Sequence, residues 1–152
     1  MKTELDFIQP VAGEQFEYSY KAEITNVYPL TKMEKLYQIQ LVDPVEREQF
    51  IFKPGQFVML ELPGIGDAPF SISSSPVRHG DLELCIRAAG NMTRFLDRVG
   101  RGTRVGISGP FGTHFPVEKM EGEDILLIAG GLGIAPLRSP ILTILEQRSR
   151  YG

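Results

Sequence analysis

Alternating apolar and polar positions predict six short strands between residues 18 and 109. The second strand shows the pattern clearly, because Tyr37 and Ile39 share one face while Gln38 and Gln40 share the other. The predicted strands cover residues 18–27, 35–42, 56–62, 69–75, 82–88 and 104–108. Turns rich in glycine and proline separate them. Short strands joined by such turns indicate a closed antiparallel barrel.

One short helix is expected within the barrel, over residues 91–99, with Asn91 as its N-cap and Gly100 as its stop. Residues 1–17 show no clear period and are expected to form an N-terminal tail. The fold prediction is therefore mainly β, with a tail followed by a six-stranded barrel over residues 18–109.

The pattern changes after a predicted linker at residues 110–123. Residues 124–129 form a nearly continuous apolar run, which is typical of a strand buried on both faces of a parallel sheet. A helix is expected to follow towards Arg150, with Pro140 kinking it or delaying its start. One strand and one helix cannot bury their own apolar faces. Residues 124–152 are therefore expected to be the start of an incomplete α/β nucleotide-binding domain.

Composition and charge narrow the class of protein. The hydrophobic fraction of 42 % supports a packed core, and the formal net charge of −3 gives no support to a nucleic-acid partner. The single cysteine, Cys85, excludes an internal disulfide and a cysteine-only metal site, and no metal site is expected. The start lacks a signal peptide, and the longest uncharged stretch is too short to span a bilayer. The sequence thus predicts a cytoplasmic protein with no membrane span.

The first segment that could carry chemistry is the serine-rich strand at residues 68–76. A strand would present Phe70 and Ile72 to one face, and Ser71 and Ser73 to the other. An aromatic ring beside hydroxyls can stack on a flat heteroaromatic ligand and form hydrogen bonds to its edge. An ordinary barrel strand with a polar outer face explains the same pattern.

The second segment, residues 90–96, follows a strand and opens the predicted helix. Amides in the first turn of a helix have no intrahelical partner and bind phosphate oxygens, and Thr93 adds a hydroxyl. Arg87 adds a cation just before the turn. The alternative is a capped surface helix with Phe95 and Leu96 in the core.

The third segment is the glycine turn at residues 130–133, which lies between the apolar run and the predicted helix. Such a turn lets a phosphate approach the backbone closely. The spacing differs from Gly-x-Gly-x-x-Gly, and the Gly-Lys-Ser/Thr ending of a P-loop is missing. A tight strand-to-helix turn with no ligand is the alternative.

In order and spacing, the three segments resemble the ferredoxin–NADP⁺ reductase superfamily. That family has an Arg-x-Tyr-Ser flavin motif, a Gly-x-x-Ser/Thr-x-x-Leu pyrophosphate motif and a Gly-Gly-x-Gly-x-Ala-Pro nicotinamide-nucleotide motif. Residues 90–96 and 130–136 match the second and third motifs at every fixed position. Residues 106–112 match the glycine–proline stretch that ends the flavin barrel. Within the superfamily, residues 68–76 are most similar to electron-transfer subunits of sulfhydrogenase (gamma), anaerobic sulfite reductase (B) and dihydroorotate dehydrogenase.

The resemblance implies a Greek-key barrel that binds FAD in preference to FMN. Ser71 falls at the serine near flavin N5 and is the implied catalytic group, and Phe70 replaces the flavin-stacking tyrosine. The family arginine that grips the pyrophosphate falls on Ala68, so Arg87 and the start of the helix are expected to replace it. The implied cofactor-binding residues are Pro69, Phe70, Ser71, Ile72, Cys85, Ile86, Arg87, Gly90, Asn91, Met92, Thr93, Gly131, Gly133, Ala135 and Pro136.

The implied function is that of a flavin-binding module in an NAD(P)H-linked oxidoreductase. Electrons would pass between the nicotinamide nucleotide, the flavin and an iron–sulfur or catalytic partner subunit. Any iron–sulfur cluster is expected in a missing C-terminal part or in the partner, and this stretch alone is expected to bind flavin without reacting with NAD(P)H. Two alternatives remain: a non-enzymatic adaptor that docks to a larger redox complex, and an oligonucleotide-binding barrel. The acidic charge balance argues against the second.

Overall fold

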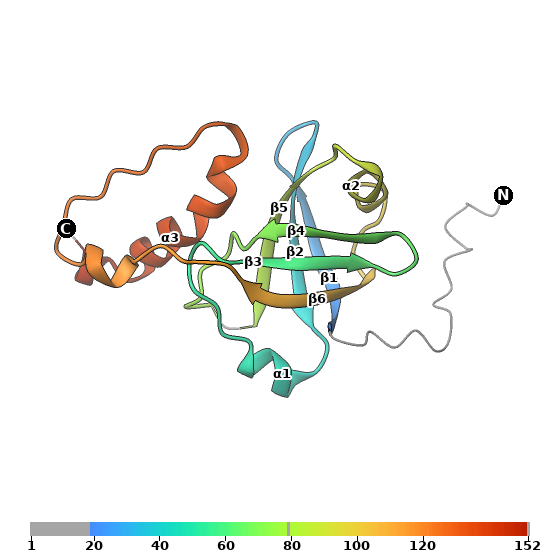
Figure 1. The fold of residues 1–152 in the computed structure, drawn as a ribbon, viewed down its shortest axis with the longest axis horizontal. Helices are drawn as coiled ribbons and strands as arrows, with labels where there is room; N and C mark the ends of the chain where they lie inside the picture. Colours follow the sequence, from blue (N-terminus) through green and yellow to red (C-terminus); the bar gives the residue numbers. More distant parts are fainter. Residues whose placement is uncertain (1–18, 79, 152) are drawn as a thin grey trace.

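The computed structural model describes residues 19–78 and 80–151 and places six antiparallel strands in one curved sheet (Figure 1). The strands are β1 (Tyr20–Pro29), β2 (Glu34–Leu41), β3 (Phe57–Leu62), β4 (Gly66–Ser71), β5 (Asp81–Arg87) and β6 (Arg104–Phe111). Their order across the sheet is β4-β3-β6-β1-β2-β5. The prediction of a mainly β, six-stranded antiparallel fold is confirmed. The predicted tail at residues 1–17 lies outside the described residues.

One face of the sheet forms the hydrophobic core. Tyr37 and Ile39 of β2, Val58 and Leu60 of β3 and Ile107 of β6 are all fully buried there. The core face of β2 is the one that the alternation of apolar and polar residues predicts. Burial of side chains of this size, at roughly 1.5–3 kcal/mol each, is the main force that holds the strands together.

The sheet does not close, so the prediction of a closed barrel is wrong in this respect. Edge strands β4 and β5 share a single isolated bridge, between Ile72 and Leu84. The Ile72 amide donates to the carbonyl that precedes β3 (3.0 Å), whereas the next amide, of Ser73, donates to Glu83 in β5 (2.7 Å). The Glu83 amide then donates to the Ser74 hydroxyl instead of a backbone carbonyl (3.1 Å). The chain thus changes its hydrogen-bonding partner from the β3 side to β5 within one residue, and β4 and β5 do not form a continuous ladder.

The strand boundaries differ from the prediction, mostly by one or two residues, and the largest differences are in β4 and β6. β4 starts at Gly66 and ends at Ser71, earlier than the predicted residues 69–75. Pro69 sits in the middle of β4, which is tolerated because β4 is an edge strand and one side of its backbone needs no partner. β6 continues to Phe111, so the predicted linker begins inside this strand.

Helix α1 (Pro44–Gln49) was not expected from the sequence. The Asp43 carboxylate accepts hydrogen bonds from the amides of Val45 (2.7 Å) and Glu46 (3.2 Å), and Pro44 occupies the first turn. These are standard features of a helix start. Asp43 and Pro44 directly follow the predicted strand at residues 35–42, so these two residues both end the strand and begin a helix.

Helix α2 (Asn91–Leu96) is shorter than predicted, and its N-cap is Gly90 in place of Asn91. The reason is that the Thr93 hydroxyl accepts a hydrogen bond from the Gly90 amide (2.9 Å), which fixes the start one residue earlier. The buried Tyr37 hydroxyl donates to the Leu96 carbonyl at the other end of the helix (3.3 Å). Contacts with β2 therefore fix where α2 lies on the sheet.

The C-terminal part is helical. It contains the 3₁₀ turns η2 (Val117–Met120), η3 (Gly131–Gly133) and η4 (Arg148–Arg150), and helix α3 (Ile134–Glu146). α3 begins at Ile134 and includes the buried Pro140, so the proline does not delay its start.

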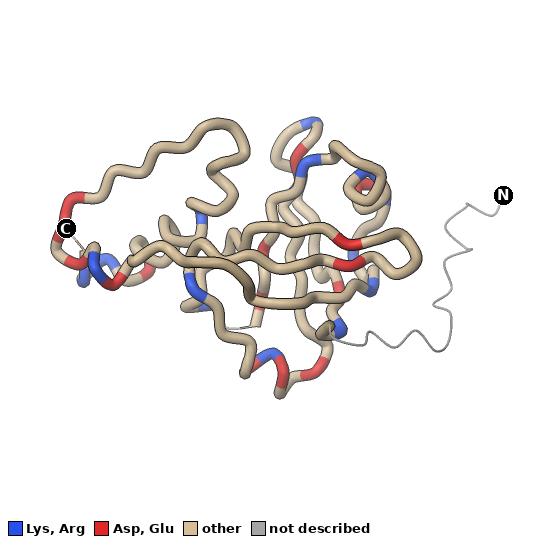
Figure 2. The backbone as a smooth tube through the Cα atoms, in the orientation of Figure 1, with Lys and Arg blue, Asp and Glu red and all other residues tan. Residues whose placement is uncertain are grey.

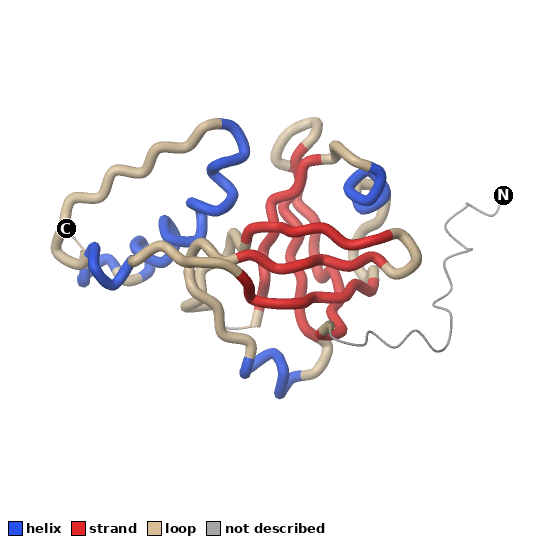
Figure 3. The backbone as a smooth tube through the Cα atoms, in the orientation of Figure 1, coloured by secondary structure: helices blue, strands red, loops and turns tan. Residues whose placement is uncertain are grey.

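The predicted strand over residues 124–129 does not form. This segment is extended but belongs to no strand, and Leu126 and Ile128 are 84 % and 82 % exposed. Figure 3 shows it as a long loop that leads to α3. An apolar run becomes a buried strand only when neighbouring strands cover it, and the described residues supply none beside this segment.

Charged positions of both signs are interspersed around the sheet (Figure 2). Lys35 pairs with Asp97 at 2.7 Å and Arg104 pairs with Glu23 at 3.1 Å. Such exposed pairs contribute at most about 1 kcal/mol each.

Candidate functional site

The end of β4 presents the first group of predicted site residues. Phe70 lies opposite Val58 and packs partly against the core, while Ser71 lies opposite Phe57 on the other face and is half-buried. Pro69 is exposed. Ile72 is fully buried, so only its backbone remains for contact with a ligand. The strand therefore offers one half-exposed ring and one hydroxyl.

The serines that follow β4 have structural partners. The Ser73 hydroxyl donates to the Ala135 carbonyl of α3 (2.8 Å), and the Ser75 hydroxyl lies 3.5 Å from that of Thr143. Together with the Ser74 bond to β5, these contacts leave all three hydroxyls buried and paired. Of the four clustered serines, Ser71 is the one left for a ligand.

The end of β5 places two of its three candidate residues on the face away from the core. Ile86 is buried in the core, whereas Cys85 is half-buried and Arg87 is exposed. Burial, followed by the negative charge of Glu34, raises the pKa of the Cys85 thiol. The thiol therefore stays protonated at neutral pH, as expected of an unreactive cysteine.

Glu34 is a site residue that sequence reasoning missed. It lies opposite Arg87 in the β2–β5 ladder and pairs with its guanidinium. Hydrogen bonds from the Thr31 hydroxyl and from Arg87 lower the pKa of the Glu34 carboxyl. Two opposite charges at strand ends were visible in the sequence, but the strand register that joins them was not.

Helix α2 contacts β4, the strand that carries Phe70. The Thr93 hydroxyl accepts hydrogen bonds from the amides of Ala89 (3.0 Å) and Gly90 (2.9 Å), so it shapes the turn. Asn91 is exposed and Met92 packs partly against the core. Because first-turn amides have no intrahelical partner, those of Asn91 and Met92 remain as donors.

The glycine turn forms η3 and leads directly into α3. Gly131 has a φ of +53°, a conformation that strongly favours glycine. A Cβ placed at Gly130, Gly131 or Gly133 would meet no atom within 4 Å, so the turn faces open space. The buried Ala135 and half-buried Pro136 then connect the turn to the sheet. In Figure 1 the turn lies to the left of the sheet and α2 to its right.

Arg138 of α3 is the second residue that sequence reasoning missed. Its guanidinium donates to the Ser73 carbonyl (2.8 Å) and forms an ion pair with the Glu83 carboxylate. Alternation along the predicted strand at residues 82–88 puts Glu83 on the face opposite Leu82 and Leu84, yet its side chain is 9 % exposed because α3 covers it. No local signal could show this contact, which joins residues far apart in the chain.

The residues brought together fit a flavin dinucleotide. Phe70 and Ser71 can meet a flat heterocycle and its polar edge, while Arg87 and the α2 amides can meet a diphosphate. A Cβ at Gly90 would lie 4.0 Å from its nearest neighbour, the Thr93 hydroxyl, so the approach to these amides is uncrowded. The fit holds without an arginine at Ala68, since Arg87 supplies the cation.

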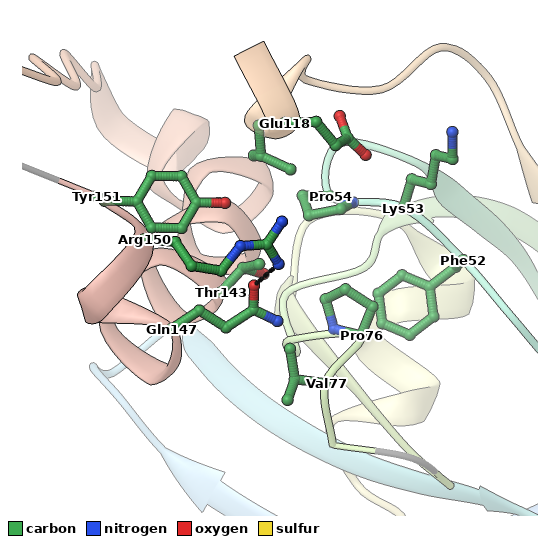
Figure 4. A pocket seen from close by; sticks show the side chains of 11 residues that line it. Phe52, Lys53, Pro54, Pro76, Val77, Glu118, Thr143, Gln147, Arg150 and Tyr151 are labelled. Atoms are coloured by element: carbon green, nitrogen blue, oxygen red, sulfur yellow. Dashed lines mark hydrogen bonds between the residues drawn. The ribbon is translucent and has the colours of Figure 1, made fainter. Parts of the chain in front are cut away.

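A separate pocket of about 280 Å³ lies between the sheet and the C-terminal part (Figure 4). The buried Phe52, Val117 and Tyr151 give it an apolar lining, and Arg150 at its edge donates to the Gln147 side chain (2.7 Å). None of the predicted site residues lines this pocket. Within residues 19–78 and 80–151, no helix is long and apolar enough to cross a membrane.

Known proteins resemble this chain in sequence. Sulfhydrogenase 1 subunit gamma of Pyrococcus furiosus is 49 % identical over 88 % of this chain and 46 % of its own length. The "Probable dihydroorotate dehydrogenase B (NAD(+)), electron transfer subunit" of Methanocaldococcus jannaschii is 37 % identical over 69 % of this chain and 36 % of its own length. The chain thus spans less than half the length of these two relatives.

Solved structures give the same fold. A ferredoxin NADP⁺ reductase from Neisseria gonorrhoeae with bound FAD and NADP superposes with a TM-score of 0.69 and 26 % identity, over 86 % of this chain and 53 % of that one. The family model described as an oxidoreductase FAD-binding domain matches residues 21–115, most of the described chain. The chain therefore belongs to the oxidoreductase FAD-binding domain family and has the ferredoxin–NADP⁺ reductase fold.

Proposed function

We propose that this chain is the FAD-binding module of an NAD(P)H-linked electron-transfer subunit. In the whole protein, electrons pass between a nicotinamide nucleotide, the flavin and an iron–sulfur or catalytic partner subunit. The electron-transfer and sulfhydrogenase subunits among its relatives support this assignment. The observation that carries it is the Ser73–Ala135 hydrogen bond, which joins the proposed flavin strand to the helix behind the glycine turn.

Each proposed site residue has a role that follows from its position. Phe70 packs against the flavin ring, and the Ser71 hydroxyl donates a hydrogen bond to the ring edge near N5. Arg87 and the first-turn amides of α2 bind the diphosphate. The bound flavin supplies the hydride and single-electron chemistry, so the protein needs no acid or base for hydride transfer itself.

The domain assignment follows the same lines. Residues 18–109 form the flavin-binding unit, and residues 124–152 begin a nucleotide-binding unit in which the turn at Gly131 and Gly133, with Ala135 and Pro136, receives the nicotinamide nucleotide. The exposure of Leu126 and Ile128 supports this proposal, because these side chains have the character of a buried strand yet lack a cover.

The first test is a visible absorption spectrum of the purified protein, with mass analysis of the cofactor released from it. We expect a flavin spectrum and the mass of FAD. A protein that is colourless and also fails to take up added FAD would overturn the flavin assignment and favour the non-enzymatic adaptor. Release of FMN would refute the specific choice of FAD.

A variant series locates the site. Arg87→Gln should weaken FAD binding by about 10-fold or more, because a charge-assisted hydrogen bond contributes roughly 1.5–3 kcal/mol, and should leave riboflavin binding unchanged. Thr93→Ala should weaken FAD binding because the turn at Gly90 loses its internal acceptor. Thr103→Ala is the matched control, since Thr103 also bonds a glycine carbonyl, that of Gly100 (2.7 Å), but at another turn. Equal effects on FAD and riboflavin would contradict a diphosphate role for Arg87.

A further inference from the structure

Ser73, two residues beyond the end of β4, makes two hydrogen bonds with residues of α3. The Ser73 amide donates to the Glu83 carbonyl (2.7 Å), its carbonyl accepts from Arg138 (2.8 Å), and its hydroxyl donates to the Ala135 carbonyl (2.8 Å). Arg138 also pairs with the Glu83 carboxylate. We name these four residues, Ser73, Glu83, Ala135 and Arg138, the serine–arginine latch.

The latch is anchored firmly on its sheet side. The Glu83 carboxylate accepts a second hydrogen bond, from the Gln38 side chain of β2 (3.0 Å). Its position therefore does not depend on Arg138 alone. Its side chain is 9 % exposed and that of Arg138 is 33 % exposed. Ionic hydrogen bonds that are shielded from water in this way are stronger than exposed ones.

The other ion pair between the sheet side and α3 is of a different kind. Arg78 pairs with Glu146 near the far end of the helix, and the Arg78 side chain is 61 % exposed. Exposed pairs of this type contribute little. The Arg138–Glu83 pair, shielded and beside the candidate site, can therefore be compared with the Arg78–Glu146 pair, which is more exposed and lies away from the site.

The latch sits between the two segments whose relative position matters for the proposed reaction. Ser73 follows Ser71 closely in the chain, and Ala135 follows Gly133 closely. A Cβ at Gly131 or Gly133 would meet no atom within 4 Å, whereas Ala135 and Arg138, just after the turn, bond to Ser73. Misplacing a reacting group by about 1 Å can lower a rate by roughly 100-fold.

We propose that Arg138 is a positioning residue, which through Ser73 and Glu83 fixes the glycine turn relative to the flavin strand. This inference rests on the proposed function, because the position of the glycine turn relative to the flavin strand matters only if nicotinamide must approach the flavin. Arg138 itself contacts neither ligand in this assignment.

The test compares Arg138→Gln with Arg78→Gln in the flavin-loaded protein, produced from its complete coding sequence. The first measurement is amide hydrogen exchange of residues 130–137, which does not depend on activity. We expect exchange there to become about 10-fold faster in Arg138→Gln and to stay unchanged in Arg78→Gln, with flavin content equal in both. Arg138→Lys should restore part of the protection.

The second measurement is single-turnover reduction of the flavin by NAD(P)H. We expect the limiting rate of Arg138→Gln to fall about 10- to 100-fold while its affinity for flavin is unchanged. Exchange that is equal in wild type and Arg138→Gln, or equally faster in both variants, would overturn the latch. If Arg138→Gln fails to fold, Glu83→Gln is tested in its place. We again expect faster amide exchange of residues 130–137, and exchange at the wild-type rate would overturn the proposal. A wild-type protein that NAD(P)H does not reduce would refute the proposed function, whereas the exchange data would still decide the latch.

Discussion

The buried phenol of Tyr37 links the stability of this fold to alkaline pH. Tyr37 is 1 % exposed, and its hydroxyl donates to the Leu96 carbonyl at the end of α2. Burial, together with the nearby negative charge of Asp97, raises the pKa of this phenol from 10 to about 12. The folded protein therefore holds its proton at a pH where an unfolded chain releases it.

The sign and size of the effect follow from this difference. Below pH 10 the phenol is protonated in both states, so its contribution to stability is fully present. As the pH rises from 10 to about 12, the unfolded chain loses the proton first, and the free energy of unfolding falls. The pKa difference corresponds to an upper limit of about 3 kcal/mol.

The perturbation is Tyr37→Phe, which removes the titrating group and one hydrogen bond. At neutral pH we expect a loss of about 1 kcal/mol in the free energy of unfolding, and a Tm lower by about 2–4 °C. At higher pH the gap between the variant and the wild type should narrow, because only the wild type continues to lose the Tyr37 contribution.

Urea unfolding followed by circular dichroism, at a series of pH values up to about 12, measures this gap directly. Tyr28→Phe is the matched control, because Tyr28 is an exposed tyrosine on the neighbouring strand β1, and this variant should keep the wild-type dependence. Parallel curves for the wild type and Tyr37→Phe across the alkaline range would refute the reasoning.

Three further outcomes are expected. Leu96→Ala truncates a fully buried side chain and should lower the free energy of unfolding by about 2–5 kcal/mol in urea titrations; a loss well below this range would contradict the packing of α2. Glu34 has a lowered pKa, so its contribution is present above its ordinary value of 4.5 and is lost as the pH falls through the folded value. Glu34→Gln should accordingly flatten the acid dependence of unfolding, and an unchanged acid limb would argue against the pair with Arg87. Leu126→Asp should change the unfolding free energy by less than about 0.5 kcal/mol, and a larger loss by urea titration would reveal a contact.

The strands could be predicted because the alternation of apolar and polar residues shows which side chains of a strand face the core. Residues that alternate into a common core, such as Tyr37 and Ile39, carry that information locally. Residues 124–129 cannot be predicted in this way. Their apolar character indicates side chains that favour burial, but whether a neighbouring strand covers them depends on residues elsewhere in the chain. The segment is extended as predicted and is nevertheless not a strand.

The candidate site was predictable to a similar degree. The glycine turn and the start of α2 are local motifs, and the structure forms a turn at the first and a helix start at the second. Glu34 and Arg138 were missed because each acquires its role from a distant partner, Arg87 and Ser73 respectively. These contacts depend on the strand register and on where the helix packs, and neither can be deduced from the spacing of residues along the chain.

The buried serines also determine where this molecule can be divided. By sequence, Ser73 and Ser75 belong to the flavin-binding unit, whose matched family region ends at residue 115. Their partners, however, are in α3. A chain cut at residue 115 would open Ser73, Ser75 and Glu83 to water and leave the end of the flavin strand without its support. The matched family region therefore ends before the contacts of its own serines do, since those contacts extend into α3.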